Sequence, residues 1–177
     1  MTIGKKLFGS FSIVIMILIF LSTFSTIKVT EIDEGYSFVI EDRVFKVMEL
    51  STIQNATSLQ GMYIRSYILR QDPADLENLN TQIETITKKI SDIENLSNTA
   101  QMQEQLSKLK DMQALYTDYV NEVVRYVDSE EMDKADNMLF EFALPTNQNI
   151  QEIINNIVST QKELMNTTST ETTAGAN

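Results

Sequence analysis

Cysteine, histidine and tryptophan are all missing from the 177 residues of this chain. Without cysteine and histidine there can be no disulfide bond, no catalytic thiol or imidazole, and none of the common thiolate or imidazole metal sites. Proline occurs only twice and glycine five times, so the chain contains few residues that interrupt helices. These absences favour long helices and predict that the chain holds no metal and no cofactor.

Acidic residues outnumber basic residues in the part of the chain that begins at Glu31. The formal net charge is −11, all 25 acidic residues lie at or after Glu31, and the basic residues that precede it are Lys5, Lys6 and Lys28. A strongly acidic surface repels nucleic acid, so we expect no nucleic-acid partner. The simplest role of this charge is to keep the domain soluble.

The motifs of common enzyme classes are also absent. The sequence has no glycine-rich phosphate loop, no carboxylate cluster with metal-ligand spacing, and no pair of nucleophile and base. The segment Asp-Lys-Ala-Asp-Asn at 133–137 lacks the glycine and the terminal glutamate of a calcium-binding loop. We therefore predict that the chain is not an enzyme.

One long uncharged run is present near the N-terminus. Residues 7–27 contain no charged side chain, and about 20 apolar residues are enough to span the hydrocarbon core of a bilayer. The run predicts a transmembrane helix over 7–28, with the lipid bilayer as its partner and the cell membrane as its location. Two lysines precede the run whereas acidic residues follow it, which predicts a cytoplasmic N-terminus (1–6). The alternative is a signal peptide that is cleaved near Ser25.

The remaining sequence predicts an all-α fold. The transmembrane helix continues into an extracytoplasmic, up-down-up-down four-helix bundle (29–168) with long first and fourth helices. The first helix should end at Arg70, because Asp72 is a good N-cap and Pro73 suits the first position of the next helix. The second helix carries an apolar heptad of Leu76, Leu79, Ile83, Ile86, Ile90 and Ile93. Composition then predicts a turn at 96–100.

The third and fourth helices carry apolar stripes of their own. The third stripe consists of Met102, Leu106, Leu109, Met112, Tyr116, Tyr119, Val123 and Tyr126. The fourth consists of Met132, Ala135, Leu139, Phe142, Ile150, Ile153, Ile157 and Leu164. The D-x-x-E pattern at 128–131 predicts a capping box that begins the fourth helix, and Pro145 predicts a kink inside it. Residues 169–177 lose all periodicity, which predicts a polar, disordered tail leading toward a second transmembrane helix.

The first helix has two apolar stripes. One consists of Phe38, Phe45, Met48, Leu59, Met62 and Leu69, and the other of Tyr36, Ile40, Val47, Leu50, Ile64 and Ile68. The stripes lie on opposite faces of a helix, so one face can enter the bundle while the other needs a second partner. We expect a parallel homodimer through the first helix. The alternative is a helix buried on all sides by its own bundle.

Both stripes become polar over 51–58. Thr52, Gln54, Asn55 and Thr57 stand at core positions there, and buried polar groups need hydrogen-bond partners. These residues predict either a ligand pocket or a polar layer that sets the register of the helices. We favour the polar layer.

Three segments follow the pattern of a known class of receptor. They are Ile-Gly-Lys-Lys-Leu-Phe at 3–8, Arg-Ser-Tyr-Ile-Leu-Arg-Gln-Asp at 65–72, and Asp-Lys-Ala-Asp-Asn-Met-Leu at 133–139. Through them, residues 1–170 resemble the sensor half of bacterial methyl-accepting chemotaxis proteins of the four-helix-bundle class. The resemblance implies a chemoreceptor-type sensor, in which an outside ligand shifts the long helices and the shift crosses the membrane.

The resemblance leaves the output open. Similar modules precede histidine kinase and cyclic-dinucleotide enzyme domains, and a non-signalling, membrane-anchored helical scaffold is a further alternative. A second apolar span of about 20 residues beyond residue 177 would support a sensor, whereas a stop codon there would support the scaffold.

The charge pattern also predicts a ligand site. Arg65 and Arg70 stand near the membrane-distal end of the first helix, and guanidinium groups bind carboxylates in bidentate fashion. Some of the receptors that this chain resembles hold amino acids between subunits with arginines at the end of this helix. We therefore expect a small anionic ligand near Arg65 and Arg70, with Tyr63 and Tyr67 beside them. The alternative is that the arginines only pair with nearby carboxylates such as Asp72 or Asp75.

Overall fold

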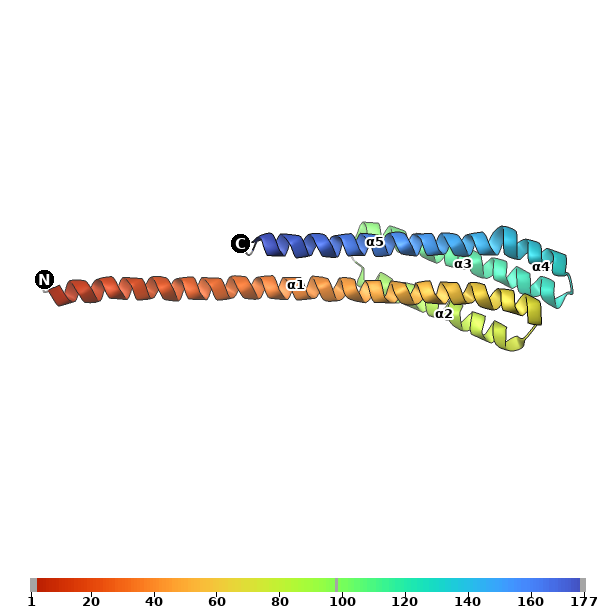
Figure 1. The fold of residues 1–177 in the computed structure, drawn as a ribbon, viewed down its shortest axis with the longest axis horizontal. Coiled ribbons are helices and arrows are strands. Elements are labelled where there is room, and N and C mark those ends of the chain that lie inside the picture. Colours follow the sequence, from red (N-terminus) through yellow and green to blue (C-terminus); the bar gives the residue numbers. More distant parts are fainter. Residues whose placement is uncertain (1–2, 98, 176–177) are drawn as a thin grey trace. The chain divides into compact units, whose positions relative to one another are not determined.

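The computed structural model describes the backbone of residues 3–97 and 99–175, and the side chains of 15–23, 41–97, 99–168 and 170. The described segments are α1 (Ile3–Arg70), α2 (Pro73–Leu96), α3 (Ala100–Asp128), α4 (Met132–Met138), the π-helical turn η1 (Leu139–Ala143) and α5 (Leu144–Gly175) (Figure 1). The all-α prediction is confirmed over these residues. The chain divides into two compact units, Arg43–Leu164 and a second unit formed by Met1–Asp42 with Met165–Asn177.

The unit Arg43–Leu164 is a four-helix bundle whose helix directions follow from side-chain contacts. The contacts that join α1 to its neighbours are Glu49–Lys89 and Arg70–Asp75 with α2, Gln60–Gln113 and Tyr67–Asp128 with α3, and Gln54–Asn155 and Ser58–Gln151 with α5. Residue numbers rise together between α1 and α3, and they run in opposite directions between α1 and both α2 and α5. The bundle therefore has the expected up-down-up-down order.

The core of this unit is built from the predicted stripes. In α2, Leu79, Ile86, Ile90 and Ile93 are buried, whereas Leu76 and Ile83 are half-buried. In α3 the buried members are Met102, Leu106, Leu109, Tyr116 and Val123. Burying one such aliphatic side chain contributes about 1.5–3 kcal/mol, so these heptads stabilise the bundle far more than any single polar contact.

The first turn of the bundle follows the predicted chemistry. The Asp72 carboxylate accepts a hydrogen bond of 3.0 Å from the Ala74 N–H, and Pro73 occupies the first helical position of α2. Gln71 takes a positive φ of 52° and completes the reversal. The predicted end of the first helix and start of the second are confirmed.

The predicted capping box at 128–131 is wrong. Helix α3 continues through Asp128, and α4 begins at Met132 after Glu131, whose side chain makes no capping bond. The Asp128 carboxylate instead accepts the hydroxyl of Tyr67 at 2.7 Å. Because this tertiary bond occupies Asp128 and Glu130 makes the reversal with a φ of 61°, the chain turns later than the local pattern indicates.

Pro145 does not end the fourth helix. The turn η1 precedes it, and the Leu144 N–H bonds the Leu139 carbonyl five residues back. In a regular α-helix the proline ring would clash with the carbonyl of Glu141, and the wider π turn relieves that clash. The extra residue also shifts the helical phase, so Ala143 is buried and the predicted core residue Phe142 is 43% exposed.

The C-terminal end of the last predicted stripe and the tail also differ from expectation. Leu164 is exposed, and α5 extends to Gly175, so residues 169–175 are helical where the sequence predicts a disordered tail. Thr170 donates its hydroxyl to the Asn166 carbonyl at 2.8 Å. Such bonds one helical turn apart let small polar residues lie within a helix.

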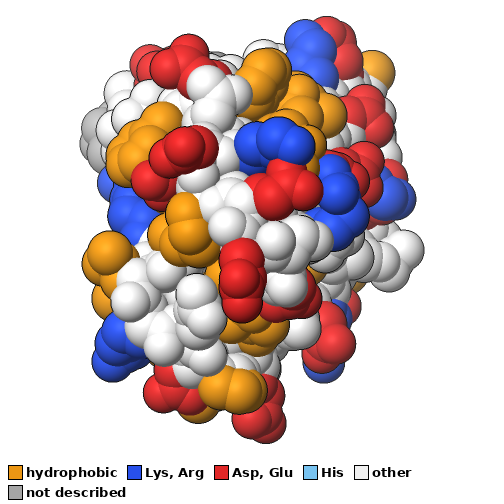
Figure 2. Space-filling model, turned by 90° about the vertical axis from the view of Figure 1, so that its right-hand side faces the viewer, with side chains coloured by type: hydrophobic (Ala, Val, Ile, Leu, Met, Phe, Trp, Pro, Cys, Tyr) orange, Lys and Arg blue, Asp and Glu red, His pale blue; other side chains and the backbone are white. Residues whose placement is uncertain are grey.

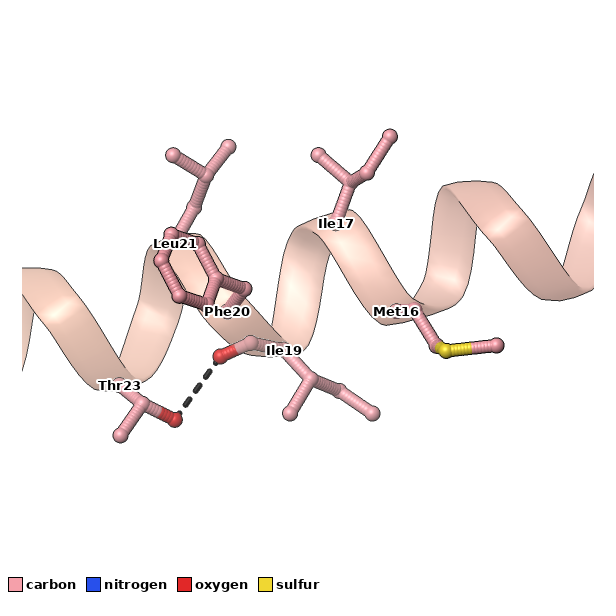
Figure 3. A pocket seen from close by; sticks show the side chains of 6 residues that line it. All are labelled: Met16, Ile17, Ile19, Phe20, Leu21 and Thr23. Carbon is pink, nitrogen blue, oxygen red and sulfur yellow. Dashed lines mark hydrogen bonds between the residues drawn. The ribbon is translucent and has the colours of Figure 1, made fainter.

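The N-terminal part of α1 exposes its apolar side chains on every side. All seven residues of 15–21 are large, apolar and exposed. Figure 3 shows Met16, Ile17, Ile19, Phe20 and Leu21 projecting in different directions from the helix, with Thr23 bonded to the Ile19 carbonyl at 2.8 Å. Among the described residues, no helix meets the length and hydropathy that crossing a membrane requires. Most side chains of the predicted 7–28 span, like the N-terminal pair 1–2, lie outside the described residues.

Candidate ligand site at the end of the first helix

Arg70 ends α1 and is held by the first turn of α2. Its Nη2 lies 2.8 Å and 3.0 Å from the two carboxylate oxygens of Asp75. Asp75 is only 4% exposed, whereas the Arg70 side chain is 62% exposed. Pairing with a nearby carboxylate is the alternative to a ligand site that the sequence leaves open, and Arg70 makes such a pair. Both bonds use one nitrogen, so the rest of the guanidinium faces outward.

Tyr67 is part of the structural framework. The side chain is 6% exposed and its hydroxyl donates to Asp128 at the end of α3. Burial, the bond to Asp128 and the negative charge of that carboxylate together raise the pKa of Tyr67 to about 12. Tyr63 packs half-buried against the same core. Neither tyrosine is placed as a free recognition group.

Arg65 differs from every other arginine at this end of the bundle. It is exposed, and it makes no ion pair with any described side chain. Its Nη1 lies near Gly61, where an added Cβ would be 3.8 Å from it and 3.4 Å from the Asn147 amide of α5. Arg65 thus stands beside the α1–α5 contact, whereas Arg70 stands beside α2. Within one chain the structure does not bring the two arginines together.

The other cations at this end are paired. Arg125 bonds Glu122 at 2.6 Å and Lys134 pairs with Glu131, while both cations lie over the ring of Tyr126. Figure 2 views the bundle from this end and shows blue and red side chains next to one another over its surface. A cation without a carboxylate partner is therefore a local exception, and Arg65 is that exception among the described arginines at this end of the bundle.

The four residues of the predicted polar layer separate onto different faces. Thr57 is fully buried and donates to the Ile53 carbonyl, and Gln54 donates to Asn155 of α5 at 2.8 Å. Thr52 is exposed and bonds the Met48 carbonyl, and Asn55 is exposed. Two of the four lie at the bundle contacts and two on the outer surface. They do not line one pocket.

A polar layer does cross the bundle core, but its central pair was missed. Gln60 and Gln113 exchange amide hydrogen bonds of 3.3 Å and 3.0 Å and are 0% and 3% exposed. Asn147 donates to the Thr57 carbonyl at 3.0 Å. The sequence could have indicated that Gln60 is buried, because position 60 lies on the same face of α1 as positions 53, 57 and 64, which are buried. The layer joins three helices through amides.

Tyr116 stands at this layer without a hydrogen bond. Its side chain is 0% exposed, and its hydroxyl makes no hydrogen bond to any residue that the structure describes. Burial raises the pKa of Tyr116 well above its ordinary value, although the nearby Asn147 and Arg65 side chains act in the opposite direction. An unpaired buried hydroxyl is uncommon.

Acidic side chains do not gather into a metal site in the described part of the chain. No group of three His, Cys, Asp or Glu residues converges there.

Two solved structures share the four-helix-bundle fold of this chain. One is titled "Periplasmic sensor domain of sensor histidine kinase", with a TM-score of 0.63 and 11% identity, covering 78% of this chain and 93% of that one. Another comes from a "XylFII-LytSN complex", with a TM-score of 0.52 and 15% identity, covering 71% of this chain and 97% of that one. A search of curated proteins found no match.

The family is defined by sequence. The model of the four helix bundle sensory module for signal transduction matches residues 1–176. The chain belongs to this family, and it is a sensor module for signal transduction.

Proposed function

We propose that the chain is the ligand-sensing and transmembrane-signalling part of a chemoreceptor-type protein, with its bundle outside the cytoplasm. The observation that carries the proposal is the single helix α1, which runs from Ile3 to Arg70 without a break. The same helix holds the uncharged run 7–27 and, at its far end, Arg65, which has no ion pair with a described residue. A displacement of α1 caused by a ligand would therefore reach the membrane through hydrogen-bonded backbone.

The proposed anchor rests on exposed apolar surface. Seven consecutive large apolar residues at 15–21 exposed on all sides are unfavourable in water and favourable in lipid. We expect the chain to remain in the membrane fraction at high salt and to keep its N-terminus. N-terminal sequencing of the extracted protein checks this, and a mature start near Ser25 would show that the segment is a signal peptide.

The proposed dimer rests on the outer face of α1. Of the two predicted stripes, Leu50, Ile64 and Ile68 are buried in the bundle, whereas Phe45, Met48, Met62 and Leu69 are exposed. The exposed residues repeat at heptad spacing, as in a two-stranded coiled coil. A second copy of α1, parallel to the first, would cover them.

Cysteine crosslinking tests the dimer directly because the chain has no cysteine. Single cysteines at Met48, Met62 and Leu69 are expected to form disulfide-linked dimers in membranes. Cysteines at Asn80 and Lys88, which are exposed on α2, serve as matched controls and should not. Equal crosslinking at both sets would contradict the proposed face.

The dimer would unite the two arginines that a single chain keeps apart. Ser66 and Leu69 stand at heptad core positions of this α1–α1 contact. Arg65 directly precedes Ser66, and Arg70 directly follows Leu69. In a parallel coiled coil such flanking positions meet across the subunits, so Arg65 of one subunit would face Arg70 of its partner. Two like charges repel, and a small carboxylate between them would relieve the repulsion with bidentate bonds.

Thermal-shift screening of the chain in detergent against amino acids and organic acids tests the ligand. A ligand at about 100 times its Kd stabilises a protein by about 2.7 kcal/mol. We expect that shift to vanish in Arg65→Ala and Arg70→Ala and to persist in the control Lys88→Ala. A shift that survives both arginine variants would instead place the site at the polar layer around Gln54.

A second candidate is the sensor region of a histidine kinase. The solved sensor domain described above, which shares this fold, favours it. The coding sequence after residue 177 separates the two candidates. A signalling hairpin with methylation sites would support the chemoreceptor, and a kinase or cyclic-dinucleotide enzyme domain would support the alternative.

A further inference from the structure

The outer face of α1 forms an uninterrupted heptad pattern that we call the outer stripe. Its members are Phe45, Met48, Thr52, Asn55, Leu59, Met62, Ser66 and Leu69, which alternate spacings of three and four residues. All are exposed except Leu59 and Ser66, which are half-buried. The stripe carries no charged residue. Thr52, Asn55 and Ser66 are its polar members, and the others are apolar.

Asn55 is the only amide in the outer stripe, and, like the Ser66 hydroxyl, it makes no hydrogen bond to a described residue. Its neighbours have partners, since Thr52 bonds the Met48 carbonyl, Gln54 bonds Asn155 and Thr57 bonds the Ile53 carbonyl. The Asn55 carboxamide makes no hydrogen bond to any described residue. An amide has two donors and an acceptor with two lone pairs, so its natural partner is a second amide.

A second copy of the same helix brings that partner only in one alignment. When two stripes lie parallel and in register, Asn55 meets Asn55 of the partner subunit. A shift of one heptad would place it against a methionine, Met48 or Met62, of the other copy. An antiparallel pairing with full overlap would place it against a leucine, Leu59. Each of these other pairings buries an amide without a partner, which is strongly unfavourable.

We propose that Asn55 fixes the register of the α1–α1 homodimer. This inference rests on the dimer proposed above and goes beyond it, because the apolar residues alone pair almost equally well in several alignments. Removing the amide should therefore keep the association and lose its uniqueness, as buried polar residues do in coiled coils.

The experiment measures crosslinking in the full-length chain in detergent, where the bilayer does not hold the two copies level. Met62→Cys crosslinked to itself reports the in-register dimer. A mixture of Met62→Cys and Leu69→Cys chains reports the shifted one through a disulfide between the two differently tagged chains. Both reporters are made with Asn55, with Asn55→Leu and, as a matched control, with Asn80→Leu on the exposed side of α2.

With Asn55 we expect in-register disulfides to exceed shifted ones by at least about tenfold. Asn55→Leu should bring the two within about threefold while total crosslinking is kept or rises, and Asn80→Leu should change nothing. If the Asn55→Leu dimer stays in register, the proposed role of Asn55 is overturned while the proposed dimer stands. The absence of disulfides in every chain overturns the proposed dimer, and the role of Asn55 with it.

Discussion

Replacing the buried amide pair of the bundle core gives the sharpest test of the structure. Gln60 and Gln113 satisfy each other across α1 and α3. Gln60→Leu or Gln113→Leu alone would leave the other amide buried without a partner, which costs about 1–3 kcal/mol. The double variant removes both polar groups, and leucine fills nearly the same volume. Its free energy of unfolding should return to within about 1 kcal/mol of the parent.

Urea unfolding followed by circular dichroism measures this cycle. The pair should show a coupling energy of at least about 1 kcal/mol, because residues in one hydrogen-bond network are not additive. Gln101→Leu, at an exposed site of α3, controls for the general effect of replacing a glutamine. Two neutral single variants, or a double variant that loses the sum of the single losses, would show that the amides are not paired in the core.

Three further predictions concern single residues. Tyr116→Phe should leave stability unchanged or raise it by up to about 2 kcal/mol, since the lost hydroxyl is buried and unpaired; a loss above 1 kcal/mol in urea unfolding would mean that the hydroxyl has a partner. Tyr67→Phe should lower stability, and it should also remove a pH dependence. The pKa of Tyr67 is raised to about 12 in the folded chain from its ordinary value of 10.0. This shift contributes stability that is present below pH 10 and is lost as the pH rises toward 12. Unfolding curves of the parent and of Tyr67→Phe at pH 9 and pH 11.5 check that the parent loses more stability as the pH rises. Ile64→Ala, at a site that is 0% exposed, should cost about 2–5 kcal/mol, and a cost below 1 kcal/mol in the same assay would place it outside the core.

Periodicity predicted most of the bundle because each helix buries one face. The second and third stripes, the Asp72 cap and the opposed faces of α1 all follow from spacing alone. Two errors have different causes. Asp128 bonds Tyr67, 61 positions away in the chain, and does not cap a helix, so no short window of sequence contains that contact. The π turn is a local bond between Leu144 and Leu139, and it moves Phe142 outward and Ala143 inward, because it breaks the regular period on which the predicted stripe depends.

The candidate site was less predictable than the fold. Sequence position placed Arg65 and Arg70 at the same end of α1, but a side chain's partners depend on the neighbouring helices. Only the structure shows that Asp75 holds Arg70 while Arg65 has no ion pair with the described residues. Likewise, Gln60 and Gln113 are 53 positions apart in the chain, so neither residue's local sequence indicates the other.

The π turn makes one part of the fourth helix tolerant of a change in length. A plain α-helical path across η1 would need one residue fewer, because each π turn accommodates one additional residue. Deleting Phe140 together with Pro145→Ala would let α4 and α5 join as an ordinary helix with their inward faces unmoved. The same deletion at Gln148 would rotate everything after it by about 100° and turn Ile150 and Ile154 out of the core. Length variation in this helix is therefore expected at 139–143.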